Sequence, residues 1–260
     1  MPWTPSRTQV GLVLGGGAAL GAAHAGVLQA LDQAGVYCTV VVGTSAGALI
    51  GGAYAAGLTG SQITELVLTA QWSEFARWNL NRRMGLLDSN PLEQSIEKYV
   101  GTRQIEDLGR RFGALAFDVL AREPVLLDAG PLAVALRASS AVPGLFPPVR
   151  VEGRLLVDGA VYDNIPVWAA RQLGANYVIA VGLDNGPTVD AGVGTRALDV
   201  ISGARRARGL DIHRASTTAD VLVCPDTRGL SKWTTRDVPR LVDAGRLAVE
   251  QTLEEIVNGQ

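Results

Sequence analysis

The chain has 260 residues and a mass of 27.2 kDa, which suits one large domain with an ample hydrophobic core. Hydrophobic residues make up 47% of the chain and charged residues 18%, a balance that excludes an intrinsically disordered protein. The formal net charge is −2, so the composition gives no general electrostatic reason to bind nucleic acid. Two cysteines cannot form a disulfide scaffold, and we expect a reducing, cytoplasmic environment.

Neither a signal peptide nor a membrane span is expected. The first nine residues contain no apolar run, and the stretch that follows is interrupted by three glycines. The longest uncharged apolar stretch, residues 46–58, has 13 residues and falls short of the roughly 18 to 20 that a bilayer crossing requires. We therefore expect any contact with a membrane to be peripheral.

Two strand–turn–helix units open the chain. Residues 10–14 form a short apolar run that ends at glycines, and residues 18–34 follow with apolar side chains at helical spacing. Residues 38–42 are largely β-branched and apolar, and residues 46–56 are small and apolar, which predicts a second strand and a second helix. Each turn thus lies between a buried strand and a helix.

The later chain continues this alternation. We expect strands at residues 113–120, 177–183 and 221–224 and helices at residues 165–172 and 238–256. Residues 61–108 are predicted to form a long helical stretch, which we interpret as an insertion over the sheet. This insertion is also a candidate lid. The sequence therefore predicts a single α/β domain over residues 1–260, a three-layer fold with a mostly parallel central sheet and helices on both faces.

Residues 43–47 (GTSAG) fit the pattern G-x-S-x-G between a strand and a helix, the context of a nucleophile elbow. Gly43 and Gly47 allow a tight, strained turn that presents the Ser45 hydroxyl at a helix N-terminus, where backbone N–H groups favour negative charge. The alternative is a helix N-cap serine in a glycine-rich turn. We interpret Ser45 as a candidate nucleophile.

Residues 15–21 (GGGAALG) form a second glycine-rich turn between a strand and a helix, so their amides can point at an anion. A dinucleotide site is the competing hypothesis, and it requires an acidic residue at the end of the second strand. That strand instead ends at residues 43–45 (GTS). A loop beside a nucleophilic serine is better placed to supply the amides of an oxyanion hole.

A nucleophilic serine needs a base, and His24 and His213 are the only histidines. A triad of Ser45, Asp158 and His213 would follow the chain order of α/β-hydrolases, but His213 lies in an arginine-rich helical stretch that is typical of a solvated face. His24 fits a packed structural histidine. Asp158 ends an apolar run before Gly159, where turn chemistry is the alternative to a catalytic role.

Together these residues resemble the patatin-like phospholipase family, most closely its small bacterial members. The resemblance extends in order over residues 10–183. Four blocks carry it, namely residues 14–31 (LGGGAALGAAHAGVLQAL), 43–52 (GTSAGALIGG), 138–149 (ASSAVPGLFPPV) and 156–173 (LVDGAVYDNIPVWAARQL).

The resemblance implies a Ser–Asp dyad of Ser45 and Asp158 that needs no histidine, metal or cofactor. One departure is Leu20, because small bacterial members usually carry arginine before the last glycine of the loop. Ser139 and Ser140 fall in the family's small-residue turn, where we expect no second nucleophile. The implied oxyanion-hole residues are Gly15, Gly16, Gly17 and Ala18, and the supporting motif residues are Gly43, Gly47, Gly159, Ala160 and Asn164.

Acyl-chain binding is predicted in the insertion. Trp72, Phe75 and Trp78 are spaced by three residues, which would put the rings on one helical face. Core packing is the alternative to substrate binding, and nearby arginines keep contact with an anionic lipid surface open.

The expected function is hydrolysis of fatty-acyl esters of phospholipids or lysophospholipids. The partners would be a lipid ester and, as an open alternative, a membrane surface, whereas the oligomeric state is not determined by the sequence. Two other functions remain open, a catalytically silent lipid-binding or regulatory protein of the same fold and a nucleotide-binding oxidoreductase. We expect kcat/KM to depend on a group that titrates well below pH 6.5 unless burial raises the pKa of Asp158.

Overall fold

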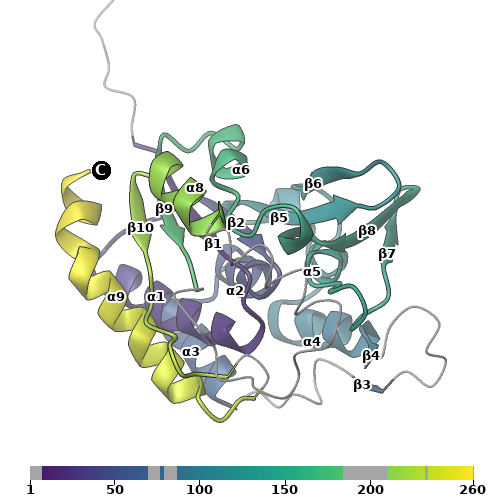
Figure 1. Cartoon of the computed structure of the whole chain (residues 1–260), viewed down its shortest axis with the longest axis horizontal. Coiled ribbons are helices and arrows are strands. Elements are labelled where there is room, and N and C mark those ends of the chain that lie inside the picture. Colours follow the sequence, from purple (N-terminus) through teal and green to yellow (C-terminus); the bar gives the residue numbers. More distant parts are fainter. Residues whose placement is uncertain (1–7, 70–76, 79–86, 184–209, 232–233, 260) are drawn as a thin grey trace, which may run out of the picture.

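The computed structural model describes residues 8–69, 77–78, 87–183, 210–231 and 234–259 (Figure 1). Most of the strands within them belong to one central sheet. These strands are β1 (Val10–Leu14), β2 (Val40–Thr44), β5 (Arg111–Asp118), β6 (Glu123–Leu127), β7 (Val149–Val151), β8 (Arg154–Asp158), β9 (Tyr177–Val181) and β10 (Val221–Val223). They follow the order β10-β9-β1-β2-β5-β8-β7, with β6 also paired to β5.

Helices cover both faces of this sheet. They are η1 (Ala18–Gly21), α1 (Ala22–Gln33), α2 (Ala46–Ala55), α3 (Gly60–Thr69), α4 (Asn90–Val100), η3 (Ile105–Asp107), α5 (Leu132–Ser139), η4 (Gly159–Val161), α6 (Val167–Gln172), α8 (Leu210–Thr218) and α9 (Val238–Asn258). In Figure 1, α1 and α9 lie below the sheet and α6 and α8 lie above it. The predicted three-layer α/β fold is confirmed.

The first half of the sheet is parallel, and its strands are buried on both faces because the connecting helices cover them. Along β1 the side chains alternate, so that Leu12 joins the cluster with α1 and α9 while Val13 joins the cluster with α6. β1 pairs in parallel with both β2 and β9, and β2 pairs in parallel with β5. The expected strand at residues 10–14 is confirmed, and the expected helix at residues 18–34 is observed as η1 followed by α1.

Antiparallel strands extend the other half, and the sequence did not indicate β6 or β7. β7 and β8 form a hairpin whose two turn residues, Glu152 and Gly153, have φ values of 49° and 82°. Positive φ at both central residues is the geometry of a tight hairpin turn that matches the twist of the strands. The hairpin ends at Asp158, so it determines where this carboxyl group lies.

The register of β5 shows how β2 and β8 meet. Residues 114–118 of β5 pair with β6, which therefore occupies one edge of that strand. β2 pairs with residues 111–115 and β8 with residues 116–118, so both must use the opposite edge. Since β2 is parallel to β5 and β8 is antiparallel, their carboxyl ends face each other. Thr44 lies opposite Leu115 and Asp158 opposite Ala116, the next residue.

The insertion differs from the sequence prediction. Residues 61–108 do not form one helical stretch, because α3 is followed by the short strands β3 (Arg77–Trp78) and β4 (Leu87–Asp88), and then by α4. Trp78 pairs with Leu87, so the predicted helical face that includes Trp78 is wrong. A spacing of three residues cannot reveal a pairing between distant strands. Trp72 and Phe75 lie outside the described residues.

Two glycines bring α1 and α9 into close contact. A Cβ atom on Gly245 would lie 1.9 Å from the carbonyl oxygen of Ala23, and one on Gly26 would lie 1.9 Å from the carbonyl oxygen of Val242. These contacts involve backbone atoms, which cannot move away as a flexible side chain would. The two helices therefore pack backbone to backbone at this crossing.

We expect Gly245→Ala to destabilise the protein by about 2 kcal/mol or more, because overpacking forces the helices apart. At an exposed helical position the same change would instead stabilise by about 1 kcal/mol. Denaturant unfolding measures the difference. Gly109→Ala is the matched control, because nothing lies within 4 Å of a Cβ atom there. An unchanged free energy of unfolding in Gly245→Ala would contradict the close packing.

Candidate active site

Ser45 lies at the turn between β2 and α2 in a strained backbone conformation. Its φ is 55° and its ψ −123°, and a positive φ at a residue with a side chain costs about 1 to 3 kcal/mol. The flanking glycines are required by space, because a Cβ atom on Gly43 would lie 2.4 Å from the Ala48 backbone and one on Gly47 would lie 2.1 Å from the carbonyl oxygen of Leu14. The Ser45 side chain makes no capping hydrogen bond, so the N-cap alternative does not account for it.

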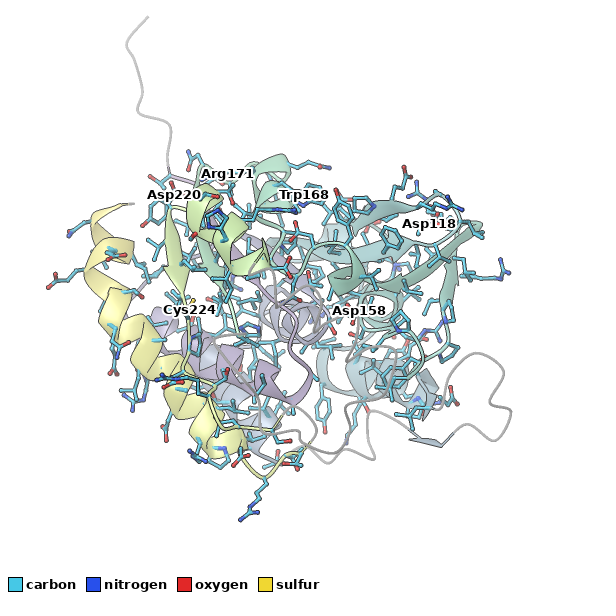
Figure 2. All side chains as sticks on the ribbon, viewed as in Figure 1. Asp118, Asp158, Trp168, Arg171, Asp220 and Cys224 are labelled. Carbon is cyan, nitrogen blue, oxygen red and sulfur yellow. The ribbon has the colours of Figure 1, made fainter. Side chains whose placement is uncertain are left out.

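The Ser45 side chain lies near the carboxyl group of Asp158 and is one of the groups that lower its pKa. Only 3% of Asp158 is exposed, and its Oδ1 accepts the backbone N–H of Ala160 at 2.9 Å. Burial raises the pKa of Asp158 to about 6, although the Ser45 side chain and the Ala160 N–H favour the ionised form and oppose this shift. Figure 2 shows Asp158 near the centre of the molecule. The structure therefore brings the two residues that the sequence singled out close together.

Neither histidine has a hydrogen bond to Ser45 or Asp158 among those found in the described residues. His213 is exposed on α8, where its carbonyl oxygen accepts the hydroxyl of Ser216 at 2.8 Å. His24 is fully buried on α1, and its Nε2 lies 2.7 Å from the carbonyl oxygen of Gly15. Burial lowers the pKa of His24 to about 4, which keeps the ring neutral near neutral pH. The structural interpretation of His24 therefore fits its surroundings.

The glycine loop lies against Ser45. A Cβ atom on Gly16 would be 3.1 Å from the Cβ of Ser45 and 2.7 Å from the Oδ1 of Asn164. Asn164 holds the loop in place through two hydrogen bonds. Its Oδ1 accepts the N–H of Gly16 at 3.0 Å, and its Nδ2 donates to the Gly16 carbonyl at 3.2 Å. A side chain at Gly16 would thus displace either Asn164 or Ser45.

The amides of the loop are not equivalent. The N–H of Gly15 donates to the carbonyl of Val181 at 3.0 Å, and that of Gly16 donates to Asn164, so both already have acceptors. Within the described residues, the N–H groups of Gly17 and Ala18 have no hydrogen-bond acceptor. Ala18 is also strained, with a φ of 51°. Of the four loop residues that the sequence predicts for an oxyanion hole, Gly17 and Ala18 therefore have backbone amides that are available to a ligand.

The loop after Asp158 is held by its own hydrogen bonds. Asp163 is almost fully buried, and its carboxylate accepts the backbone N–H of Ile165 at 3.2 Å and the indole N–H of Trp168 at 3.0 Å. Arg214 on α8 lies 3.4 Å from the same carboxylate. Figure 2 shows Trp168 at the upper side of the molecule, above Asp158. These bonds fix the segment that places Asn164 against the glycine loop.

The sequence analysis missed the part that Ser139 plays in this site. The Oγ of Ser139 accepts the backbone N–H of Ser45 at 3.0 Å and donates to the carbonyl of Leu115 at 2.7 Å. Its place in a conspicuous small-residue motif was the only available signal, and that motif does not reveal a partner 94 residues away.

Two further searches concern metals and membranes. Among the described residues, no group of three or more His, Cys, Asp and Glu side chains is arranged to hold a metal ion. None of the described helices combines the length and the apolar character that crossing a bilayer requires.

Comparison with known proteins assigns the family. Residues 12–171 match the family model described as patatin-like phospholipase, which covers more than half of the chain. The chain belongs to the patatin-like phospholipase family. Ser45, Asp158 and the glycine loop of this patatin-like protein all fall within the matched residues. The family match decides against the dinucleotide-binding alternative.

Curated relatives of this patatin-like protein are mostly longer chains. An uncharacterized NTE family protein of Mycobacterium tuberculosis is 36% identical over 203 residues, which cover 72% of this chain and 53% of the relative. A protein of Aspergillus fumigatus named lysophospholipase nte1 is 33% identical over 189 residues, covering 69% of this chain and 12% of the relative. The chain thus spans about half the length of the mycobacterial relative.

Two solved structures share the fold at low sequence identity. VipD from Legionella pneumophila has a TM-score of 0.57 and 14% identity, with 97% of this chain and 67% of that chain covered. The type III effector protein ExoU has a TM-score of 0.55 and 16% identity, with 97% and 54% covered. At these identities the likeness concerns the fold alone.

We expect Asp158→Asn to stabilise the protein above pH 6. The pKa of Asp158 is raised on folding from 3.8 to about 6, so its favourable contribution is complete below pH 3.8 and is lost as the pH rises through about 6. A neutral amide escapes that loss, which amounts to about 3 kcal/mol at pH 8. Chemical unfolding at pH 4 and pH 8 tests this. Equal differences between variant and wild type at both pH values would contradict the burial of an ionised carboxylate.

Proposed function

We propose that this patatin-like protein is a serine acyl hydrolase that cleaves fatty-acyl esters of phospholipids or lysophospholipids. The observation that carries the proposal is that β2 and β8 end beside each other, which brings the strained Ser45 close to the buried carboxyl group of Asp158. A nucleophile close to its own base is the arrangement expected for covalent ester hydrolysis. The family match and the relative named lysophospholipase support a lipid ester as the substrate class.

The first chemical step forms an acyl-serine. As the Ser45 Oγ attacks the ester carbonyl carbon, its proton passes to the Asp158 carboxylate, and the carbonyl oxygen gains the negative charge. The N–H groups of Gly17 and Ala18, beside the N-terminus of α2, are the donors that we assign to this oxyanion. When the tetrahedral intermediate collapses, the alkoxide leaving group takes the proton back from Asp158.

The second step releases the fatty acid. Water attacks the acyl carbon while Asp158 takes one of its protons, and the new intermediate expels the Ser45 alkoxide, which recovers that proton. The raised pKa of Asp158 suits a group that first accepts and then returns a proton. A carboxylate with a pKa of about 6 accepts a proton more readily than an ordinary carboxylate does.

Leu20 motivates a second candidate, a lipid-binding protein of the same fold without turnover. Small bacterial members usually carry arginine at this position, whereas Leu20 is 1% exposed within the largest hydrophobic cluster. A buried leucine supplies no guanidinium for a headgroup or carboxylate. The backbone amides of the loop do not depend on this side chain, so the hydrolase remains the better supported function.

Substrate contacts outside the dyad are part of the proposal. Trp72, Phe75 and Trp78 are proposed to contact acyl chains, and a peripheral encounter with a lipid surface in the cytoplasm would present the ester to Ser45. We assign no metal and no cofactor to the reaction.

We expect Ser45→Ala to lower kcat/KM for p-nitrophenyl esters of medium chain length by at least about 1000-fold, because the nucleophile is lost. Asp158→Asn should cost about 100- to 10,000-fold, the usual range for a general base. Release of p-nitrophenol measures both variants, with circular dichroism to confirm folding. Ser61→Ala changes an exposed serine on α3 and serves as the control. Wild type that binds phospholipid vesicles without turnover would favour the lipid-binding candidate, whereas an active Ser45→Ala would show that Ser45 is not the nucleophile.

We also expect kcat/KM to rise with pH through an apparent pKa of about 6, because Asp158 must be ionised to accept the proton. An ordinary histidine titrates at about 6.5, so the pKa value alone does not identify the group. The pH profile of His213→Ala is therefore the decisive measurement. A profile unchanged by His213→Ala fits the dyad, whereas loss of the titration in that variant would assign the base to His213.

A further inference from the structure

We infer that Ser139, at the C-terminus of α5, is a positioning residue that aligns the Ser45 backbone with Asp158. This inference rests on the proposed function of Ser45 and Asp158, and it concerns how their relative position is maintained. Ser139 does not touch the reacting atoms, because it meets Ser45 at the backbone N–H and not at the hydroxyl.

The orientation of the Ser139 hydroxyl is fixed by two partners. It donates its single proton to the carbonyl of Leu115 at 2.7 Å and accepts the N–H of Ser45 at 3.0 Å. Ser139 has no exposed surface, so solvent does not replace either bond. Because the proton is committed to Leu115, Ser139 is itself a poor nucleophile.

The N–H of Ser45 needs such a partner. Ser45 precedes the first turn of α2, whose N–H groups have no acceptors within the helix. Its φ of 55° is held only if the surroundings compensate for the strain. The hydrogen bond to Ser139 supplies that compensation at the strained residue itself.

The same turn of chain holds the second member of the dyad. The backbone N–H of Asp158 donates to the carbonyl of Ala141 at 3.0 Å, two residues after Ser139. Ser139 and Ala141 thus bind the N–H groups of Ser45 and Asp158, respectively. Leu115, which anchors Ser139, belongs to the β5 edge where β2 and β8 meet. Ser139 and Ala141 therefore determine how far apart the side chains of Ser45 and Asp158 lie.

We expect Ser139→Ala to lower kcat for p-nitrophenyl esters by about 10- to 100-fold with a much smaller change in KM, because a shift of about 1 Å in a reacting group has effects of this size. The apparent pKa of kcat/KM should rise above that of the wild type, since displacing the Ser45 side chain weakens one interaction that lowers the pKa of Asp158. Rates are expressed per active site, which excludes a loss due only to unfolded protein.

Three variants separate this role from packing. Ser139→Cys fills nearly the same space with weaker hydrogen bonding and should behave like Ser139→Ala. Ser139→Thr retains the hydroxyl and should restore the pH profile. Ser140→Ala is the matched control, because within the described residues the buried Oγ of Ser140 has no partner, so kcat and the profile should stay unchanged.

Amide hydrogen exchange at Ser45, followed by NMR, tests the inference without activity. Exchange should accelerate at least about 10-fold in Ser139→Ala and Ser139→Cys but not in Ser140→Ala. The inference would be overturned by unchanged amide exchange in Ser139→Ala and Ser139→Cys, or by a wild-type kcat and pH profile in these two variants. If the wild type is inactive but amide exchange at Ser45 is still accelerated in Ser139→Ala and Ser139→Cys, the proposed hydrolase is refuted. The role of Ser139 in positioning the Ser45 backbone then remains.

Discussion

The meeting of β2 and β8 on one edge of β5 is the constraint on which the rest of the site depends. β6 already occupies the opposite edge, so β8 has only the part of β5 that β2 leaves unpaired. Two strands that run toward each other must stop where they meet, and they stop at Thr44 and Asp158. The helix α2 then begins at Ser45, which places a hydroxyl near a carboxylate.

Holding these groups together is costly for the folded state. An almost fully buried carboxylate with a raised pKa and two strained residues with positive φ, Ser45 and Ala18, lie close together. Such features persist only where the surroundings compensate for them. Here the compensation comes from the hydrogen bonds between Asn164 and Gly16 and from the hydrogen bond that the Ser45 N–H donates to Ser139. The strain and the burial around Ser45 and Asp158 are thus offset by hydrogen bonds from residues that lie beside them.

The helical layer below the sheet supports the glycine loop from behind. His24 on α1 contacts the Gly15 carbonyl, and α1 is in turn packed against α9 through Gly26 and Gly245. Because backbone atoms are in contact at this crossing, α1 has little freedom to shift. The position of the loop beside Ser45 therefore depends on a helix more than 200 residues away in the sequence.

The sequence by itself determined the strand–turn–helix units and the parallel half of the sheet, because local periodicity and glycine spacing encode them. It also singled out Ser45 and the glycine loop by their motifs, and Asp158 by the family resemblance, as candidates for the chemistry. It did not reveal the hairpin at Trp78, strands β6 and β7, or the place of Ser139. Only the tertiary structure decided that Gly15 and Gly16 already have acceptors and that Asp158 is buried enough to raise its pKa. Those properties arise from partners far apart in the chain, which no local pattern specifies.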